Sequence, residues 1–190
     1  MGKTVGILAL QGDFEAHAAA VRRAGAEAVE VRTAEQLDAV DGLIIPGGES
    51  TTMLKLLNAM DLKEPLRRFA AHKPVFGTCA GAILAAREVS HPQQESLGLM
   101  DIAVERNAYG RQLDSRIVEI QPENGDLSGG ALEAVFIRAP IIRRVGPEAK
   151  VVARYNGDPV LVSQGRHMVA TFHPELTGDT RVHRMFIDRL

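Results

Sequence analysis

The first half of the chain alternates strand-sized apolar runs with helix-forming stretches, and this alternation limits the folds open to it. The run from Val5 to Leu10 is continuously apolar apart from one glycine, as in a strand buried on both faces. Comparable runs occur at 27–32, 42–45 and 74–78, with helical patterns at 14–24, 34–40, 50–57, 63–71 and 80–89. Because strands joined by helical crossovers pair in parallel, the pattern predicts an α/β domain with a parallel sheet.

The second half is less regular and predicts a different kind of strand pairing. Short strand patterns follow one another at 115–121, 134–138, 151–155, 159–163 and 167–172, and a terminal helix is expected at 181–190. Short strands without helices between them favour antiparallel pairing. We therefore expect one domain, residues 1–190, with a mostly parallel central sheet flanked by helices and antiparallel additions in the second half.

Composition excludes several classes of function. The chain of 190 residues has 22 basic and 24 acidic residues and only 4% aromatic residues, which argues against a nucleic-acid surface. Its single cysteine cannot form an internal disulfide, so a reducing cytoplasm is the expected location. The apolar run near the N-terminus is strand-sized, and we expect neither a signal peptide nor a membrane span.

That single cysteine lies in a motif that gives it a chemical role. Gly77-Thr78-Cys79-Ala80-Gly81 has the form of a nucleophile elbow, in which small flanking residues permit a sharp turn from strand to helix. The positive end of the following helix favours the thiolate, which is the reactive form. A lone cysteine is more often a small buried hydrophobe, but this setting favours a nucleophile.

A thiolate that attacks an amide needs a general acid for the leaving amine, and His173 is the best candidate among six histidines. It ends a strand pattern, and His173-Pro174-Glu175 places a carboxylate where it can orient the imidazole, as the third member of a triad does. An isolated motif of this kind is as often a polar turn, so the interpretation depends on Cys79.

The other histidines are expected to be structural or solvated. His17 and His183 fall in expected helices, and His72 and His91 fall in loop-like positions. His167 could share a strand face with His173, but two histidines without further ligands are weak support for a metal site. We expect neither a metal nor a cofactor.

A second glycine turn, Pro46-Gly47-Gly48-Glu49-Ser50, follows an expected strand. Glycines there let backbone N–H groups approach a substrate oxygen closely, and we expect an oxyanion hole from the N–H groups of Gly48 and Ala80. Ser50 is the expected N-cap of the next helix. The turn is not a Walker phosphate loop, because no Gly-Lys-Ser/Thr sequence follows it.

Together the three motifs, in this order and spacing, resemble the class I glutamine amidotransferases, which implies their three-layer, flavodoxin-like fold. Further stretches are similar to the family of glutaminase subunits of pyridoxal 5′-phosphate synthase: 10–12, 47–53, 97–101, 104–107, 110–112 and 136–140. The usual Arg-Asn-Ser-Phe-Gly-Arg-Gln stretch of that family stands here as Arg-Asn-Ala-Tyr-Gly-Arg-Gln at 106–112.

The resemblance implies a residue-by-residue assignment. The triad would be Cys79, His173 and Glu175, and the L-glutamine site would comprise Gly47, Gly48, Glu49, Arg106, Ile137 and Arg138. An arginine can pair bidentately with the α-carboxylate of glutamine, although either arginine could instead be a surface ion pair. Gln11, beside a strand end, is a further candidate participant.

The resemblance also implies a partner. Glutamine hydrolysis would supply ammonia to a barrel-shaped synthase subunit that builds pyridoxal 5′-phosphate, with little glutaminase activity until that subunit docks. Three alternatives stay open at this stage: a glutaminase subunit of another amidotransferase complex, a related cysteine peptidase, and a non-catalytic regulatory subunit.

Overall fold

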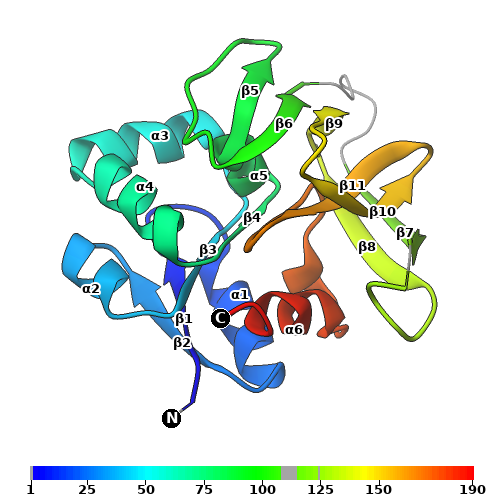
Figure 1. Ribbon diagram of the computed structural model, residues 1–190, viewed down its shortest axis with the longest axis horizontal. Helices are drawn as coiled ribbons and strands as arrows, with labels where there is room; N and C mark the ends of the chain where they lie inside the picture. The colour runs from blue at the N-terminus through cyan, green and yellow to red at the C-terminus, as the bar shows by residue number, and fades with distance from the viewer. Residues whose placement is uncertain (1, 108–114, 124) are drawn as a thin grey trace.

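The computed structural model describes residues 2–107, 115–123 and 125–190. Five parallel strands form one half of a nine-stranded central sheet (Figure 1). In spatial order they are β2 (Glu27–Val31), β1 (Thr4–Leu8), β3 (Gly42–Ile45), β4 (Val75–Thr78) and β12 (His167–Ala170). This is the strand order of flavodoxin-like folds, in which ligands bind beyond the carboxyl ends of the strands.

Four antiparallel strands extend the sheet beyond β12. They are β11 (Asp158–Gln164), β10 (Lys150–Tyr155), β7 (Ser115–Pro122) and β8 (Leu132–Ile137). The parallel first half and the antiparallel additions both follow the prediction, and the sheet as a whole is mixed.

Helices cover both faces of the parallel half and complete the three layers. On one face, α1 (Phe14–Arg23) and α6 (Arg181–Ile187) lie side by side and pack through Val21 and Phe186 onto Val5, Ile7 and Phe76 (Figure 1). The opposite face carries α2 (Ala34–Asp38), α3 (Ser50–Ala59), α4 (Lys63–His72) and α5 (Ala80–Ala85). Their apolar residues form the second core cluster, with Leu43, Ile45 and Val75 of the sheet.

A second sheet of three strands was not predicted. It consists of β5 (Ala86–Ser90), β6 (Met100–Glu105) and β9 (Ile141–Val145), and it packs against α5. The expected helix 80–89 therefore ends at Ala85. Ala86, Arg87 and Glu88 are residues of good to moderate helix propensity, but pairing of this segment with β6 overrides that preference.

The start of α3 also differs from expectation. Its N-cap is Glu49 instead of Ser50, because the Glu49 carboxylate accepts hydrogen bonds from the backbone N–H groups of Thr51 (3.2 Å) and Thr52 (2.7 Å). Ser50 is the first helical residue, and its hydroxyl donates to Gln94 Oε1 at 3.1 Å. A residue of the predicted glutamine site is thus also the cap of the neighbouring helix.

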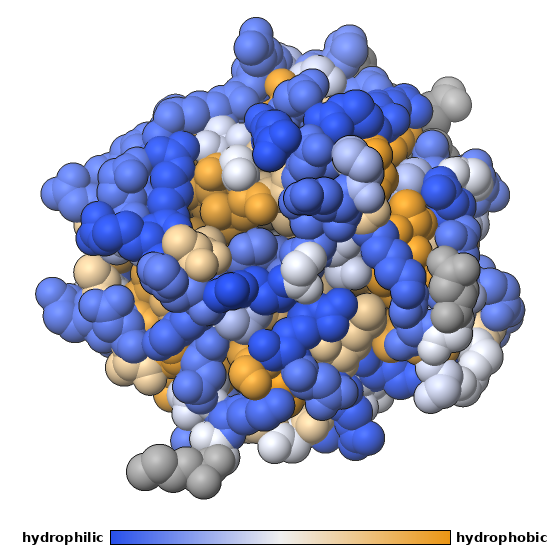
Figure 2. All heavy atoms as spheres, viewed as in Figure 1, coloured by the Kyte–Doolittle hydropathy of each residue, from blue (hydrophilic) through white to orange (hydrophobic). Residues whose placement is uncertain are grey.

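The surface is mostly hydrophilic on the face that Figure 2 shows, with scattered apolar areas. The large apolar side chains that are exposed among the described residues are Val29, Met60, Ile117 and Leu176. Within residues 2–107, 115–123 and 125–190, we find no helix with both the length and the apolar character needed to cross a membrane.

The glycines of the elbow permit the close packing of α5 on the sheet. A Cβ atom at Gly81 would clash with the Ile45 carbonyl oxygen, and one at Gly77 would clash with the Gly81 carbonyl oxygen. Neither glycine has a positive φ, so close backbone approach is the reason that these positions lack side chains.

We expect Gly81→Ala to lower the free energy of unfolding by about 1–3 kcal/mol, because backbone atoms of β3 must move to admit the methyl group. Urea unfolding monitored by circular dichroism measures the change. Gly178→Ala is the matched control, since its added Cβ meets no atom within 4 Å, and it should leave stability almost unchanged. Equal stability of the two variants would contradict the packing argument.

Candidate active site

The carboxyl ends of β3, β4 and β12 border a cavity of about 530 Å³. Cys79, His173 and nearly all the other residues predicted for the site line it, namely Gly47, Gly48, Glu49, Ala80, Arg106, Ile137 and Arg138. Gln11 and Leu176 line it as well. Glu175 does not, because it is buried behind His173.

Cys79 occupies the strained turn that the elbow motif predicts. Its φ of 50° and ψ of −107° lie outside the regions that side chains with a Cβ atom prefer. The turn is held by a hydrogen bond of 2.8 Å from Cys79 N–H to the Ala170 carbonyl of β12, and Sγ lies 3.9 Å from the Ile137 carbonyl oxygen. The surrounding structure therefore fixes the direction in which the thiol projects.

His173 and Glu175 form the hydrogen-bonded pair that the sequence predicts. His173 Nδ1 lies 2.7 Å from Glu175 Oε1, and the Glu175 side chain is fully buried. The His173 backbone N–H donates to the Val135 carbonyl of β8 at 2.8 Å, and Pro174 begins a short 3₁₀ helix, η2 (Pro174–Leu176). The imidazole is thus positioned both by its own backbone and by the carboxylate.

The electrostatics of this pair favour an imidazolium. Burial lowers the pKa of His173, but hydrogen bonds and charge interactions with Cys79 and Glu175 outweigh it and raise the pKa from 6.5 to about 10. Cys79 and His173 both lie beside Gly47. This position suits an imidazole that transfers a proton near the cysteine sulfur.

The glycine turn leaves room beside these two side chains. A Cβ atom at Gly47 would lie 2.6 Å from His173 Cε1 and 3.3 Å from Cys79 Cβ, so only glycine fits. Gly48 has a φ of +146° and packs against Gln11, whose Oε1 accepts from Glu49 N–H at 2.8 Å. Gln11 therefore holds the turn in place at the edge of the cavity.

Arg106 is anchored at the same edge. Its Nη2 donates to Thr51 Oγ1 at 2.9 Å and lies 3.5 Å from Glu49 Oε1, and its side chain is only 14% exposed. Arg138 is exposed and has a positive φ of 41°. Of the 106–112 stretch, residues 108–112 lie outside the described part of the chain.

Two histidines that sequence analysis left as structural or solvated are fully buried at the base of this site. His17 of α1 and His183 of α6 contact each other, and His17 also reaches Thr78 and Glu175. The helical spacing of His17 indicates its burial, because it lies three residues after Phe14 and four before Val21 on the apolar face of α1.

The weak metal hypothesis for His167 gains no support. His167 Nδ1 accepts a hydrogen bond from Val75 N–H at 3.2 Å, at the opposite end of β4 from Cys79. In the part of the chain that the structure describes, no three His, Cys, Asp or Glu side chains are grouped so that they could bind a metal ion.

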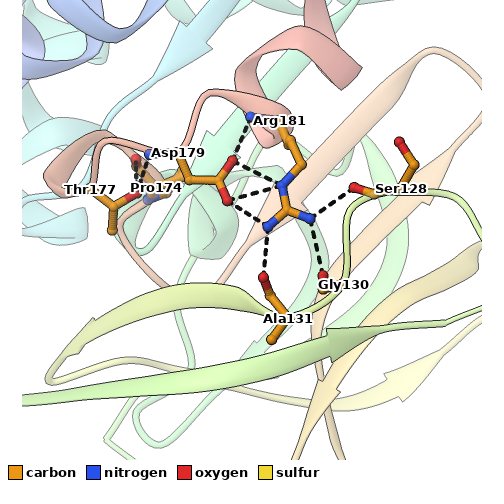
Figure 3. Close-up of polar contacts among 7 residues, drawn as sticks. All are labelled: Ser128, Gly130, Ala131, Pro174, Thr177, Asp179 and Arg181. Carbon is orange, nitrogen blue, oxygen red and sulfur yellow. Dashed lines mark hydrogen bonds and ion pairs between the residues drawn. The ribbon is translucent and has the colours of Figure 1, made fainter.

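An arginine anchors the segment that follows His173 and Glu175. Arg181 donates to the carbonyl oxygens of Ser128, Gly130 and Ala131 and forms an ion pair with Asp179 (Figure 3). Burial raises the pKa of Asp179, but hydrogen bonds and charge from Arg181 outweigh this and lower it. These contacts fix the end of the His173 segment to the loop that leads into β8.

A cysteine on a strand-to-helix elbow, with an imidazole held by a buried carboxylate beside a glycine turn, is the arrangement of a cysteine-dependent acyl-transfer enzyme. The SNO glutamine amidotransferase family matches residues 7–190. The chain belongs to this family.

Similar proteins extend over the whole chain. The Pyridoxal 5′-phosphate synthase subunit PdxT of Solibacter usitatus is 62% identical over 192 aligned positions, covering 99% of this chain and 100% of the relative. PdxT of Koribacter versatilis is 55% identical, covering 96% and 93%. A crystal structure of a glutamine amidotransferase is 46% identical with a TM-score of 0.90, covering 97% of each chain. PurLQS from Thermotoga maritima shares the fold, with a TM-score of 0.71, 18% identity and 99% coverage of each chain.

We expect the His173 imidazolium to persist through neutral pH and to titrate near pH 10 in the wild type. In Cys79→Ala the pKa should fall, because burial then opposes the charge with only Glu175 to favour it. NMR titration of the imidazole carbon resonances measures both values. Titration of the two proteins at the same pH would contradict the interaction with Cys79.

The same shift has a consequence for stability. The pKa of His173 in the folded protein lies above its unfolded value of 6.5. Protonated His173 therefore stabilises the fold fully below about pH 6.5, and this contribution is lost as the pH rises through about 10. Urea unfolding from neutral to alkaline pH should therefore show a steeper loss of stability for the wild type than for His173→Gln.

Proposed function

We propose that this chain is the glutaminase subunit of a pyridoxal 5′-phosphate synthase, hydrolysing L-glutamine to L-glutamate and ammonia. The observation that supports this most strongly is the convergence of Cys79, His173 and Glu175 at one cavity, in a chain similar over its full length to PdxT proteins. We further propose the cytoplasm as its location, where a free thiol stays reduced.

In the proposed first half-reaction, the Cys79 thiolate attacks the side-chain carboxamide carbon of glutamine. The developing oxyanion accepts hydrogen bonds from the backbone N–H groups of Gly48 and Ala80. His173 gives its proton to the amide nitrogen, the C–N bond breaks, and ammonia leaves a γ-glutamyl thioester on Cys79.

The second half-reaction uses the same groups in reverse. Neutral His173 takes a proton from water, the resulting hydroxide adds to the thioester carbonyl, and the C–S bond breaks. The γ-carboxylic acid leaves and loses its proton to water to give glutamate, and the thiolate and imidazolium are restored. Glu175 keeps the Nδ1 proton in place and stabilises the imidazolium in both half-reactions.

We assign the amino-acid head group of glutamine to the mouth of the cavity. Its α-carboxylate would pair with Arg106 and Arg138, and its α-ammonium would lie near Glu49. Gly47, Gly48 and Ile137 would line the path of the side chain toward Cys79. Arg106 is well placed for this role, because Thr51 and Glu49 hold its guanidinium at the cavity edge.

The proposed partner is the barrel-shaped synthase subunit that consumes the ammonia. In bulk water ammonia becomes ammonium, which has no lone pair for nucleophilic attack, so a productive donor has to deliver it through a sheltered passage. We expect glutaminase activity to be low for the isolated chain and to rise when the synthase subunit docks.

The decisive measurement is glutamate release from glutamine, with and without the synthase subunit, for the wild type and Cys79→Ala. We expect the wild-type complex to exceed the Cys79→Ala complex by roughly three orders of magnitude or more, since removal of the nucleophile leaves only residual catalysis. A wild type no faster than the mutant would refute the glutaminase assignment. Activation by a different synthase, or hydrolysis of peptides in place of glutamine, would support one of the alternative functions.

Arg106 provides a test of the glutamine site. We expect Arg106→Gln to raise KM for glutamine by roughly tenfold or more with little change in kcat, because pairing with the α-carboxylate is equal in ground and transition states. Steady-state kinetics of the complex measure both. Arg87→Gln is the control, since Arg87 is an exposed partner of Asp101, and equal KM values for the two variants would contradict the assignment.

A further inference from the structure

A continuous chain of buried polar side chains lies behind the triad and leads away from the cavity. His17 Nε2 is 3.3 Å from Glu175 Oε2 and 3.0 Å from Thr78 Oγ1, while His17 Nδ1 is 3.1 Å from His183 Nε2. Three of these side chains belong to residues that are 0% exposed: His17, Thr78 and His183. The mechanism above uses none of the three.

These buried side chains matter for the triad because of the second carboxylate oxygen of Glu175. Oε1 is occupied by His173, whereas Oε2 has no hydrogen-bond partner among the described residues and lies 3.3 Å from His17 Nε2. A buried carboxylate oxygen without a donor is costly. His17 Nε2 hydrogen-bonds to Thr78 Oγ1 at 3.0 Å and is also close enough to Oε2 to offset part of this cost electrostatically.

The contact with Glu175 favours one tautomer for each of the two histidines. If His17 Nε2 were unprotonated, its lone pair would face the Glu175 carboxylate oxygen at 3.3 Å, which is repulsive. With the proton on Nε2, Nδ1 becomes an acceptor and His183 Nε2–H supplies its hydrogen. His183 Nδ1 is then a lone pair without a partner, which is less costly than an unpaired donor.

Both imidazoles are neutral in this arrangement. Burial and the neighbouring His183 and His173 lower the pKa of His17 well below 6.5, and burial and Arg23 lower that of His183 to about 4. His17 thus acts on Glu175 as an oriented dipole and adds no charge to the site.

We propose that His17 is a positioning residue for the triad, whose Nε2–H is shared between Thr78 Oγ1 at 3.0 Å and Glu175 Oε2 at 3.3 Å and so holds the carboxylate that orients His173. This inference rests on the proposed glutaminase function. His17 touches neither the substrate cavity nor the reacting atoms, and its contact with Thr78 also links the triad carboxylate to the residue that precedes Cys79.

The test compares three replacements of His17 in the complex with the synthase subunit. His17→Leu removes both nitrogens, His17→Gln places an amide nitrogen close to the Nε2 position, and His17→Asn carries one only as far as Nδ1. We expect His17→Leu to lower kcat roughly ten- to hundredfold, the scale typical of groups that orient a reacting residue through another, with KM within about twofold of the wild type. His17→Gln should recover most of the loss and His17→Asn little of it.

A double-mutant cycle separates positioning from general structural support. In the Glu175→Ala background, His17→Leu should have no further effect on kcat, because its influence passes through the carboxylate. Effects that multiply in the cycle, or equal kcat values for the Gln and Asn variants, would overturn the proposal. The Gln and Asn pair keeps the test decisive if the Leu variant does not fold. His167→Leu, which removes a hydrogen bond at the far end of β4, is the control and should keep wild-type kcat.

A second readout keeps failure of this inference distinct from failure of the proposed function. The rate of alkylation of Cys79 by iodoacetamide reports the thiolate and imidazolium pair in the isolated chain, without glutamine or synthase. We expect His17→Leu to slow it and His17→Gln to restore it. If the wild type does not hydrolyse glutamine but His17→Leu still slows alkylation, only the glutaminase function is refuted. If the wild type hydrolyses glutamine but His17→Leu leaves the alkylation rate unchanged, the role of His17 is refuted.

Discussion

The strained backbone turn at Cys79 ties three strands of the central sheet to the site. A positive φ at a residue with a Cβ atom costs of order 1–3 kcal/mol, so neighbouring contacts have to hold it. The hydrogen bond from Cys79 N–H to Ala170 provides one such contact, and the close approach of Gly81 to Ile45 and of Gly77 to Gly81 provides others. Three strands of the parallel sheet, β3, β4 and β12, thus meet in one turn, and the cysteine projects where their carboxyl ends open.

The antiparallel half of the sheet contributes directly to the same site. Its outermost strand, β8, accepts the backbone hydrogen bond of His173 through Val135 and ends at Ile137, whose carbonyl lies near the cysteine sulfur. Arg181 anchors the loop before β8 to the segment after Glu175. The site therefore depends on strands that are remote in the sequence, and loss of this extension would leave His173 without its backbone hydrogen bond to β8.

Most of this architecture follows from local sequence pattern. The parallel strands and helices of the first half were predicted within a few residues, because continuous apolar runs and helical faces alternate clearly there. The fold class is confirmed by the sheet order and by the related solved structures. The small sheet of β5, β6 and β9 was missed, because residues 86–88 lack strand propensity and their pairing partners are distant in the sequence.

The residues of the site also fall into those that sequence pattern predicts and those that it does not. Motifs that carry their own local geometry, at Cys79, at the glycine turn and at His173, could be identified from sequence, and the structure brings them to one cavity. His17 and His183 could not, because their significance lies in contacts across 61 to 166 residues. A helical histidine on an apolar face has no sequence signature that distinguishes it from an ordinary buried side chain.

The shape and charge of the cavity bear on the choice between a glutaminase and a peptidase. Both reactions need the same triad, so the triad alone does not separate them. The difference lies at the mouth, where Arg106 is held by Thr51 and lies beside Glu49, which offers one cation and one anion within a few ångströms. A free amino acid carries a carboxylate and an ammonium on one carbon and can pair with both. A glutamine inside a peptide has neither charge, so it would gain no ion pair with the guanidinium of Arg106 or with Glu49. In the proposed glutamine site, these two groups would therefore favour free glutamine over its peptide-bound form, which is the selectivity that an ammonia-supplying subunit requires.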